Sequence, residues 1–498
     1  MNMRNSFHNL LVLREYLGAL LFVFGLLILF PLIPLVIYYR AGAQEADPLV
    51  FLAPAIVSFF LGAVLKWRRP FRTLSGASSM LLCVVGWLVL SAVGAVPFCA
   101  GLNVSYLDAY FESVSGFTTT GITMLTGLDT MPRSILFWRS LIQWLGGLGI
   151  LTFFLLVVSA GGSAHIMFTA ESHKIFSKRP APGLFHTLRI LWSIYAAFTL
   201  LIAALLLLAG MSVYDAVSHA FTCLSTGGYS PYDASIAYFG DSGRYPYYVA
   251  IEYIIIFGMV LGGTNFFIHY RVLTGGVRAL WDNLESKLWW GILAGATFLV
   301  ALSHCLSFPE ADLAETVRHS LFQVVSIATT TGYATRDIST AYFPPLAKQV
   351  FLVLMVIGGC VGSTSGGIKV LRIGVLLKMV GRQVQRVIRG RRAVNLILVD
   401  GDKVDAEEIR RVSALFFAWL ALLAVGGGIT ALLSPHLGPM EAASGMFSAL
   451  GNIGPCYISV EAMSQLDPLV KLTYIIGMLA GRLEILPVLL LFSRKAWQ

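Results

Sequence analysis

Four short segments of this chain combine hydroxyl side chains with a closing glycine, a pattern that suits the coordination of a cation. In each segment the glycine follows an opening serine or threonine by six residues. Four such loops predict a ring of backbone carbonyls that replaces the hydration shell of a potassium ion. The candidate ion ligands are Thr118, Thr119, Thr120, Gly121, Ser225, Thr226, Gly227, Gly228, Thr329, Thr330, Thr331, Gly332, Gly451, Asn452, Ile453 and Gly454.

The glycines support this prediction more strongly than the hydroxyl groups do. Irregular backbone at membrane depth is tolerated only where it lines a cavity or is buried in protein. Glycine lets carbonyls point at one axis without a clash at Cβ. A single Thr-Gly sequence usually belongs to an ordinary loop without a function. Four such sequences at near-even intervals, each at the corresponding position between spans, favour four copies of a pore loop in one chain.

Composition places these loops in a membrane protein. Of the 498 residues, 57% are hydrophobic and only 12% are charged, and the mean hydropathy is +0.77, unlike an ordinary soluble domain. The first apolar run, from Arg14 to about Tyr38, is long enough to span and has no small-residue cleavage site, so we expect the mature protein to keep it. The six cysteines have no paired spacing, which argues against a disulfide framework and a zinc site.

The hydrophobic pattern predicts an all-α membrane protein with ten spans and four half-spans. An N-terminal two-helix hairpin, over 15–38 and 50–66, occupies residues 1–72. Four pseudo-symmetric units follow around one central pore, each with a span, a pore helix and a returning span. We expect pore unit 1 at 73–162, unit 2 at 183–273, unit 3 with a gating loop at 283–393 and unit 4 at 408–498. The paired spans are 77–98 with 134–159, 186–210 with 247–268, 288–306 with 347–380, and 412–433 with 470–492.

Basic residues indicate how the spans are oriented. Clusters within 66–72, 174–179 and 382–392 follow apolar runs, and the positive-inside rule places them in the cytoplasm together with both termini. The loops 41–48 and 240–246 carry few basic residues and are expected outside. This orientation accounts for the net charge of +9 without a nucleic-acid partner.

Acidic residues recur at one position of the predicted pore helices. Asp108, Asp215 and Glu441 each lie thirteen residues before the closing glycine of their unit, whereas unit 3 has His319 there and Glu315 one turn earlier. An acid at this point suits the free N–H groups and the positive end of a helix. We therefore expect helix caps rather than ion ligands.

Two further features predict a gate. A glycine-rich stretch interrupts the returning span of unit 3 and is unfavourable for a continuous helix. It predicts a flexible plug below the filter. The alternative is that its small residues allow close packing between helices. Arg482 lies near the middle of an apolar stretch, where it costs about 2.5–3.5 kcal/mol, and we expect it to face the pore. The alternative to a pore-facing Arg482 is an ion pair between Arg482 and Glu484. Residues two apart point to different helix faces, so we expect Glu484 to bind another helix instead. The candidate gating residues are Gly358, Gly359, Gly362, Ser363, Thr364, Ser365, Gly366, Gly367, Lys369 and Arg482.

The chain resembles the Trk/Ktr/HKT superfamily, and within it the TrkH and TrkG potassium-uptake subunits of bacteria. The resemblance rests on the four strings, at 119–121, 225–229, 326–334 and 448–455, and covers nearly the whole chain. The extra N-terminal hairpin favours the TrkH branch. The resemblance implies a homodimer with one pore per protomer, resting on a cytosolic ring of nucleotide-binding TrkA subunits. It also implies that 358–367 is an intramembrane gating loop and that Arg482 obstructs the permeation path.

These features predict potassium uptake across the bacterial inner membrane through a carbonyl-lined selectivity filter, with K⁺ as the transported ion and no organic cofactor. Sodium-preferring relatives often have serine at the first filter position, where this chain has Gly121. A weakly selective or sodium-coupled uptake system is the alternative, because unit 4 has Asn452 and Ile453 in place of a threonine pair.

A membrane-embedded enzyme is the rival from another class. It would use His219, Glu252 or Asp337, but these residues do not recur at catalytic spacing, and the sequence has no Walker loop for nucleotide hydrolysis. We therefore expect a protein without catalytic residues.

Overall fold

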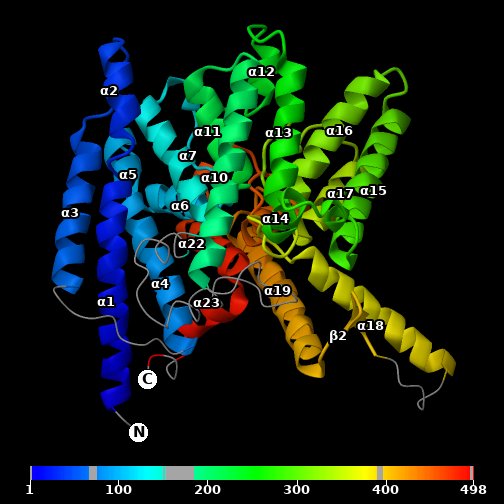
Figure 1. Ribbon diagram of the computed structural model, residues 1–498. Helices are drawn as coiled ribbons and strands as arrows, with labels where there is room; N and C mark the ends of the chain where they lie inside the picture. Colours follow the sequence, from blue (N-terminus) through cyan, green and yellow to red (C-terminus); the bar gives the residue numbers. More distant parts are fainter. Residues whose placement is uncertain are drawn as a thin grey trace.

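The computed structural model describes residues 3–66, 76–149, 152, 184–389, 396–493 and 497, and it consists almost entirely of helices (Figure 1). Within these ranges the only sheet is an antiparallel pair, β1 (Leu398–Val399) and β2 (Asp402–Lys403). The predicted all-α class is confirmed. Several basic residues of the predicted cytoplasmic clusters lie outside the described residues, namely Arg68, Arg69, Arg72, Lys174, Lys178, Arg179, Arg391 and Arg392.

The predicted N-terminal hairpin is present as two closely packed helical segments. α1 (Met3–Leu27) continues into α2 (Leu32–Arg40), and α3 (Leu49–Lys66) runs beside them at the left of Figure 1. Glycines bring α1 and α3 into backbone contact, because a Cβ on Gly62 would lie 2.8 Å from the carbonyl oxygen of Gly18. Small residues are a common means of association for helices in lipid, where burial of apolar surface gives little driving force.

Four times along the rest of the chain, a long helix is followed by a short one and then by a returning helix. The long helices are α4 (Gly76–Gly94) with its extension α5 (Val96–Leu102), α10 (Leu184–Leu208), α15 (Leu284–Ser307) and α19 (Ala406–Leu433). The short helices are α6 (Tyr106–Phe117), α11 (Val213–Leu224), α16 (Leu313–Ala328) and α20 (Pro439–Gly451). The returning helices are α7 (Arg133–Gly147), α13 (Tyr248–Gly263), α17 (Pro345–Val356) and α22 (Pro468–Leu483). This order is the predicted one, and the pseudo-symmetry around one pore stays a prediction.

Shorter elements lie in the connections between these helices. They are η1 (Leu128–Thr130), α12 (Ala237–Asp241), η2 (Val277–Leu280) and α21 (Val460–Ser464). The two largest apolar clusters of the described residues enclose the short helices. One gathers around α6 and α20, and the other around α11 and α16. The short helices are therefore held in the interior of the helical body.

The returning segments are broken, which the sequence predicted only for unit 3. α13 is followed by α14 (Phe266–Leu273) at a bend of 103°, and α22 by α23 (Ile485–Leu491) across Glu484, whose φ is 66°. In unit 3, α17 and α18 (Val370–Arg389) flank an irregular segment, as predicted. The continuous spans expected over 247–268 and 470–492 are therefore wrong.

Because the returning segments are broken, fewer long unbroken helices are found among the described residues than the ten predicted spans. In the part of the chain that the structure describes, six helices are long and apolar enough to cross a membrane, or seven if α13 and α14 form one span. The sequence predicted ten spans, because an apolar run does not reveal where tertiary contacts break a helix. The predicted span over 134–159 is described only to residue 149 and at residue 152, and α7 ends at Gly147.

The short helices begin with caps, but the capping atoms differ from the expectation in two units. Glu441 accepts a hydrogen bond from the N–H of Gly438 at 2.8 Å, as predicted. In units 1 and 2 serines cap the helix instead, because Ser105 accepts from the N–H of Asp108 and Ser212 from that of Asp215. Both aspartates lie in the first turn and bind the hydroxyl of the capping serine.

The unit 3 exception has a simple structural reason. Asp312 caps α16 by accepting from the N–H of Glu315 at 2.9 Å, so this helix begins about one turn earlier than the other three relative to its glycine. His319 consequently lies inside the helix and not at its start.

Replacing Gly62 by leucine should push α3 away from α1 and lower the melting temperature of the purified protein, with a destabilisation of about 1–3 kcal/mol from overpacking. Gly291→Leu on α15 is the matched control, because a Cβ there meets no atom within 4 Å. Equal melting temperatures for the two variants would contradict the packing role of Gly62.

Candidate functional site

The four predicted loops share one backbone conformation. In every unit the residue two before the closing glycine has a positive φ, as has the glycine itself; the first set is Thr119, Thr226, Thr330 and Asn452, with φ between 51° and 57°. The N–H of the residue before the glycine donates to the carbonyl of the opening serine or threonine at 2.8–3.0 Å in all four loops. The four loops thus repeat one irregular backbone conformation, in which two of the last three residues have positive φ.

The loops approach one another in a closed ring. A Cβ on each closing glycine would press on the carbonyl oxygen of the residue before the glycine of the next unit. A Cβ on Gly454 would lie 3.0 Å from the oxygen of Thr120, and the other three would overlap their neighbours outright. The neighbouring pairs are Gly121 with Gly227, Gly228 with Thr331, Gly332 with Ile453, and Gly454 with Thr120. Units 1, 2, 3 and 4 thus meet in order, and unit 4 meets unit 1.

The loops of units 1 and 3 are each fixed by a pair of threonine side chains of their own. Thr118 Oγ1 lies 2.7 Å from Thr120 Oγ1, and Thr329 Oγ1 lies 2.7 Å from Thr331 Oγ1. Unit 2 has Gly227 at the corresponding position.

Gln143 of α7 fills the space that the missing threonine leaves in unit 2. Its Nε2 donates to the carbonyl of Gly227 at 2.7 Å, and its Oε1 accepts from the N–H of Tyr229 at 3.0 Å. The loop of unit 2 is therefore held by a residue of unit 1, which the sequence analysis missed because the two lie far apart in the chain.

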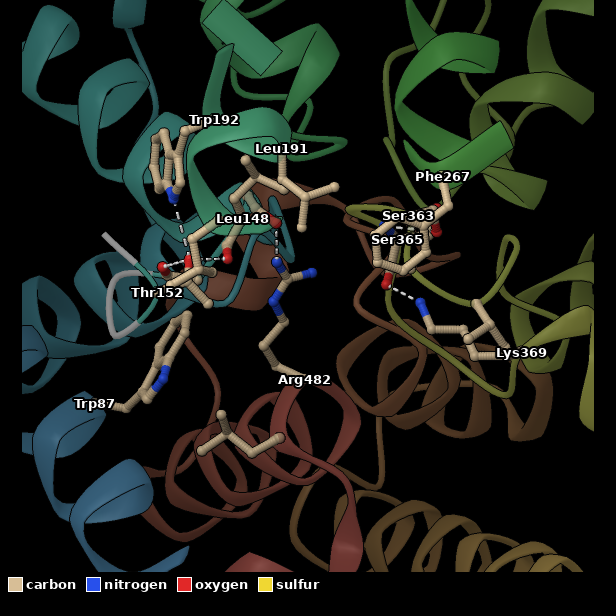
Figure 2. Close-up of a pocket in the computed structure, with 16 residues that line it drawn as sticks. Trp87, Leu148, Thr152, Leu191, Trp192, Phe267, Ser363, Ser365, Lys369 and Arg482 are labelled. Atoms are coloured by element: carbon tan, nitrogen blue, oxygen red, sulfur yellow. Dashed lines mark hydrogen bonds between the residues drawn. The ribbon is translucent and has the colours of Figure 1, made fainter. Parts of the chain in front are cut away.

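Two cavities lie on opposite sides of the ring. The larger, of about 630 Å³, is lined by all four closing glycines and by the connections near α12 and α21. The smaller, of about 120 Å³, is lined by Lys369, Arg482 and residues of the segment 358–367 (Figure 2). The ring thus borders the larger cavity, and the segment 358–367 borders the smaller one.

The segment 358–367 is irregular and packs against the ring. The N–H of Gly366 donates to Thr330 Oγ1 at 2.8 Å, and Thr226 Oγ1 donates to Thr364 Oγ1 at 3.2 Å. The N–H groups of Cys360 and Thr364 donate to carbonyls at the end of α13, at 3.0 and 3.1 Å. The segment is thus not a continuous helix that packs through small residues, and it touches the filter loops of units 2 and 3 directly.

Arg482 of α22 lies at the smaller cavity (Figure 2) and binds backbone carbonyls of two separate segments. Its guanidinium donates to the carbonyl of Thr364, and also to those of Gly146 at 2.7 Å and Gly147 at 2.5 Å. Lys369 donates its Nζ to the carbonyl of Ser365. Arg482 therefore joins the segment 358–367 to the end of α7. Lys369, which follows this segment, binds back to it through Ser365.

Glu484 binds other helices, as the sequence analysis expected. Its carboxylate lies 2.6 Å from Arg372 of α18 and 3.8 Å from Arg411 of α19. The side chain of Arg372 is only 9% exposed, so this pair contributes a nearly buried charge contact between α18 and the break after α22.

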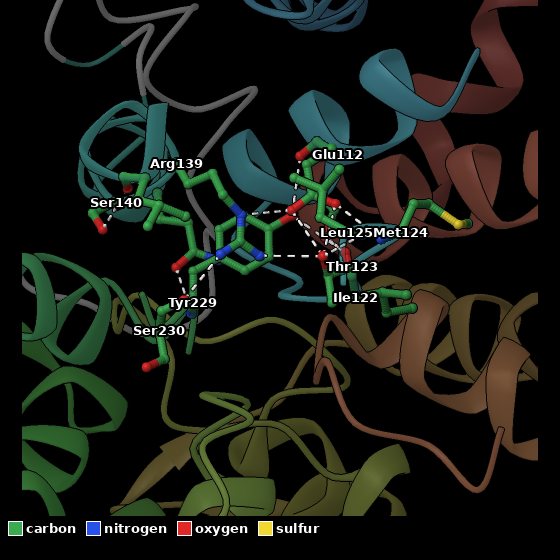
Figure 3. A network of polar contacts seen from close by, with 12 residues as sticks. Glu112, Ile122, Thr123, Met124, Leu125, Arg139, Ser140, Tyr229 and Ser230 are labelled. Atoms are coloured by element: carbon green, nitrogen blue, oxygen red, sulfur yellow. Dashed lines mark hydrogen bonds and ion pairs between the residues drawn. The ribbon is translucent and has the colours of Figure 1, made fainter. Parts of the chain in front are cut away.

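A buried ion pair behind the loops of units 1 and 2 was not predicted. Figure 3 shows Arg139 of α7 reaching Glu112 of α6 and lying over the ring of Tyr229. The Arg139–Glu112 distance is 2.7 Å, and their side chains are 2% and 0% exposed. Arg139, like Arg482, is a charged residue within an apolar stretch, and this feature could have identified it in the sequence.

The residues of the rival enzyme hypothesis do not form a site together. His219 binds the carbonyl of Asp215 and the hydroxyl of Ser230, and Glu252 pairs with Arg318 at 2.8 Å. Asp337 binds within its own loop, by accepting from the N–H of Ser339. Among the residues placed by the structure, no cluster of three or more His, Cys, Asp or Glu side chains is suited to hold a metal ion.

Comparison with known proteins gives a consistent result over nearly the whole chain. A family model described as TrkH, cation transport protein, matches residues 49–498. The Trk system potassium uptake protein TrkH of Salmonella typhimurium is 33% identical over an alignment of 499 positions that covers 98% of this chain and 99% of that protein. An uncharacterized cation transporter of Methanocaldococcus jannaschii is 33% identical over 483 residues, 96% of this chain and 94% of that protein. The crystal structure of the potassium transporter TrkH from Vibrio parahaemolyticus superimposes with a TM-score of 0.85 at 30% identity, covering 98% of this chain and 100% of that one.

Gly228→Ala should lower the melting temperature of the purified protein more than Gly243→Ala does. Both glycines have positive φ, 72° and 65°, so both variants carry a left-handed penalty of about 1–2 kcal/mol. Only at Gly228 does the new Cβ meet the carbonyl of Thr331, whereas Gly243 has no atom within 4 Å. If the two variants melted alike, the close contact between loops would not be a constraint on folding.

Proposed function

Because the chain belongs to the TrkH family of cation transport proteins, we propose that it takes up potassium across the inner membrane of a bacterium. The observation that carries this proposal is the closed ring of four glycine loops between two cavities. Backbone carbonyls of 118–121, 225–228, 329–332 and 451–454 replace the hydration shell of the ion as it passes. The work of the protein is coordination, with no bond made or broken.

Helix dipoles favour a cation at this point. The short helices α6, α11, α16 and α20 end directly at the four loops. Each helix presents the partial negative charge of its last carbonyls there, and the effect is strongest where water is scarce. Four such ends directed at one axis support a cation site without any carboxylate ligand.

The segment 358–367 and Arg482 form the gate, and the described structure corresponds to a closed state. Arg482 donates to a carbonyl of the segment and to two carbonyls of α7, so a positive charge lies between the ring and the smaller cavity. An ion leaving the filter would meet this charge and the backbone of the segment. Opening requires that the hydrogen bonds of Arg482 break and that the segment leaves the ring.

The protein works as a homodimer on a cytosolic, nucleotide-binding ring of the TrkA type, with both termini in the cytoplasm. The name of the relatives, Trk system potassium uptake protein, supports a system of several components. α18 extends away from the helical body (Figure 1) and exposes the apolar side chains of Val380, Val384, Val387 and Ile388. An exposed apolar face of this kind supports an interface with another protein chain.

A weakly selective or sodium-coupled cation uptake system is the second candidate. It is favoured by unit 4, where Asn452 donates to Thr120 Oγ1 at 2.8 Å and to the carbonyl of Met478 at 2.9 Å in place of a threonine pair. An amide at this position fixes the loop to α22 and to unit 1, which changes how its carbonyls respond to a smaller ion.

Arg482→Ala should raise rubidium uptake into proteoliposomes several-fold, because the variant lacks the side chain that joins Thr364 to Gly146 and Gly147. Arg271→Ala is the control, since Arg271 is 54% exposed and pairs with Asp282 away from the cavity. Unchanged flux in Arg482→Ala, at equal amounts of reconstituted protein, would contradict the gating role.

Tracer rubidium uptake should be blocked by external potassium and be nearly indifferent to sodium, in the wild-type chain and in Arg482→Ala alike. Gly332→Ser should weaken this discrimination, because its Cβ meets the carbonyl of Ile453 in the ring. Equal block by sodium and potassium in the wild-type chain would overturn the selective proposal in favour of the second candidate.

A further inference from the structure

One position behind the ring differs in all four units. The residue nine before the closing glycine lies on the short helix and is Glu112, His219, Gln323 and Gly445 in units 1 to 4. The first three side chains and the space beside Gly445 are buried. The chemical nature of this position therefore changes around the ring from a carboxylate to no side chain at all.

In unit 1 the carboxylate of Glu112 binds the irregular segment that follows Gly121. It accepts from Thr123 Oγ1 at 3.0 and 3.1 Å, from the N–H of Met124 at 3.0 Å and from Arg139 Nε at 2.7 Å. Thr123 and Met124, the second and third residues after Gly121, are thus tied to the short helix behind them. Hydrogen bonds to a buried charge are among the stronger ones in proteins.

Arg139 extends this support to unit 2. Its Nη1 donates to the carbonyl of Ser230 at 3.0 Å, its Nη2 donates to Thr123 Oγ1 at 3.2 Å, and its guanidinium carbon lies 3.8 Å from the ring centre of Tyr229. The hydroxyl of Tyr229 donates to the carbonyl of Glu112 at 3.0 Å. One guanidinium therefore positions the residues that follow both Gly121 and Gly228 (Figure 3).

The other units have weaker versions of this support. In unit 2, His219 Nε2 lies 3.1 Å from Ser230 Oγ, which takes the place of Thr123. In unit 3, Ala334 stands at that place, and both amide atoms of Gln323 are buried without a hydrogen-bond partner in the described part of the chain. In unit 4, the hydroxyl of Tyr474 occupies the space that a side chain at Gly445 would need.

We infer that Glu112 and Arg139 are positioning residues for ion selectivity, which hold the filter loops of units 1 and 2 at the spacing that suits potassium. This inference rests on the proposed function of the ring. A filter rejects the smaller sodium ion when its carbonyls resist moving inward. The buried pair supplies that resistance on one half of the ring, whereas Gln323 supplies none in unit 3.

The test compares potassium and sodium as competitors of rubidium uptake in proteoliposomes. Glu112→Gln and the nearly isosteric Thr123→Val should each reduce the ratio of sodium to potassium inhibition constants, by about tenfold for Glu112→Gln, because each variant loses hydrogen bonds that hold the segment after Gly121. Gln323→Leu, at the same register in unit 3, should leave the ratio unchanged. A merely structural role would lower the amount of folded protein and the maximal uptake while leaving this ratio intact.

Two outcomes would overturn the inference. One is that Glu112→Gln and Thr123→Val keep the wild-type ratio. The other is that Gln323→Leu changes the ratio as much as they do. If Glu112→Gln does not fold, Thr123→Val decides alone. Gly332→Ser is measured beside them: if it loses discrimination while the unit 1 variants retain it, the positioning inference fails and the proposed filter stands; if none of the variants alters the ratio, the proposed filter itself fails.

Discussion

Four backbone loops from distant parts of one chain approach so closely that no side chain fits at their contacts. The closing glycines Gly121, Gly228, Gly332 and Gly454 all have positive φ; the carbonyl of the neighbouring loop occupies the space of the Cβ at the first three and would crowd it at Gly454. This contact constrains the rest of the fold. Each short helix must end at the ring and therefore extends only part of the way through the helical body. Each unit then needs a third helix to bring the chain back across it.

The same constraint explains why buried charges gather near the ring. Arg139 and Arg482 both lie among apolar helices, but their partners differ. Arg139 has a carboxylate partner in Glu112 and belongs to a network that fixes two loops. Arg482 donates to carbonyls that belong to separate elements. A buried charge paired with a carboxylate is hard to displace, because removing one partner leaves the other buried and unpaired.

The sequence allowed the helical class, the order of the units, the repeated glycine loops and the interruption after α17 to be predicted, because each has a local signal. The breaks after α13 and α22 have no such signal. Gly262 and Gly481 each approach the carbonyl of a residue at the end of a short helix, Leu224 and Leu450, and these contacts are set by tertiary structure. The bridge made by Gln143 and the pairing of Arg139 with Glu112 are likewise set by tertiary structure, although Arg139 itself, a charge within an apolar stretch, has a local signal. The capping serines were missed because the recurrent acids nearby gave the more conspicuous pattern.

The most direct test of the account is to locate the ion. Crystals of the protein grown in rubidium, measured at the rubidium absorption edge, should show an anomalous peak on the axis between the four glycine loops, and potassium should displace it where sodium does not. Active, selective protein whose crystals hold rubidium elsewhere, with none between the four loops, would contradict the claim that the glycine ring is the selectivity filter.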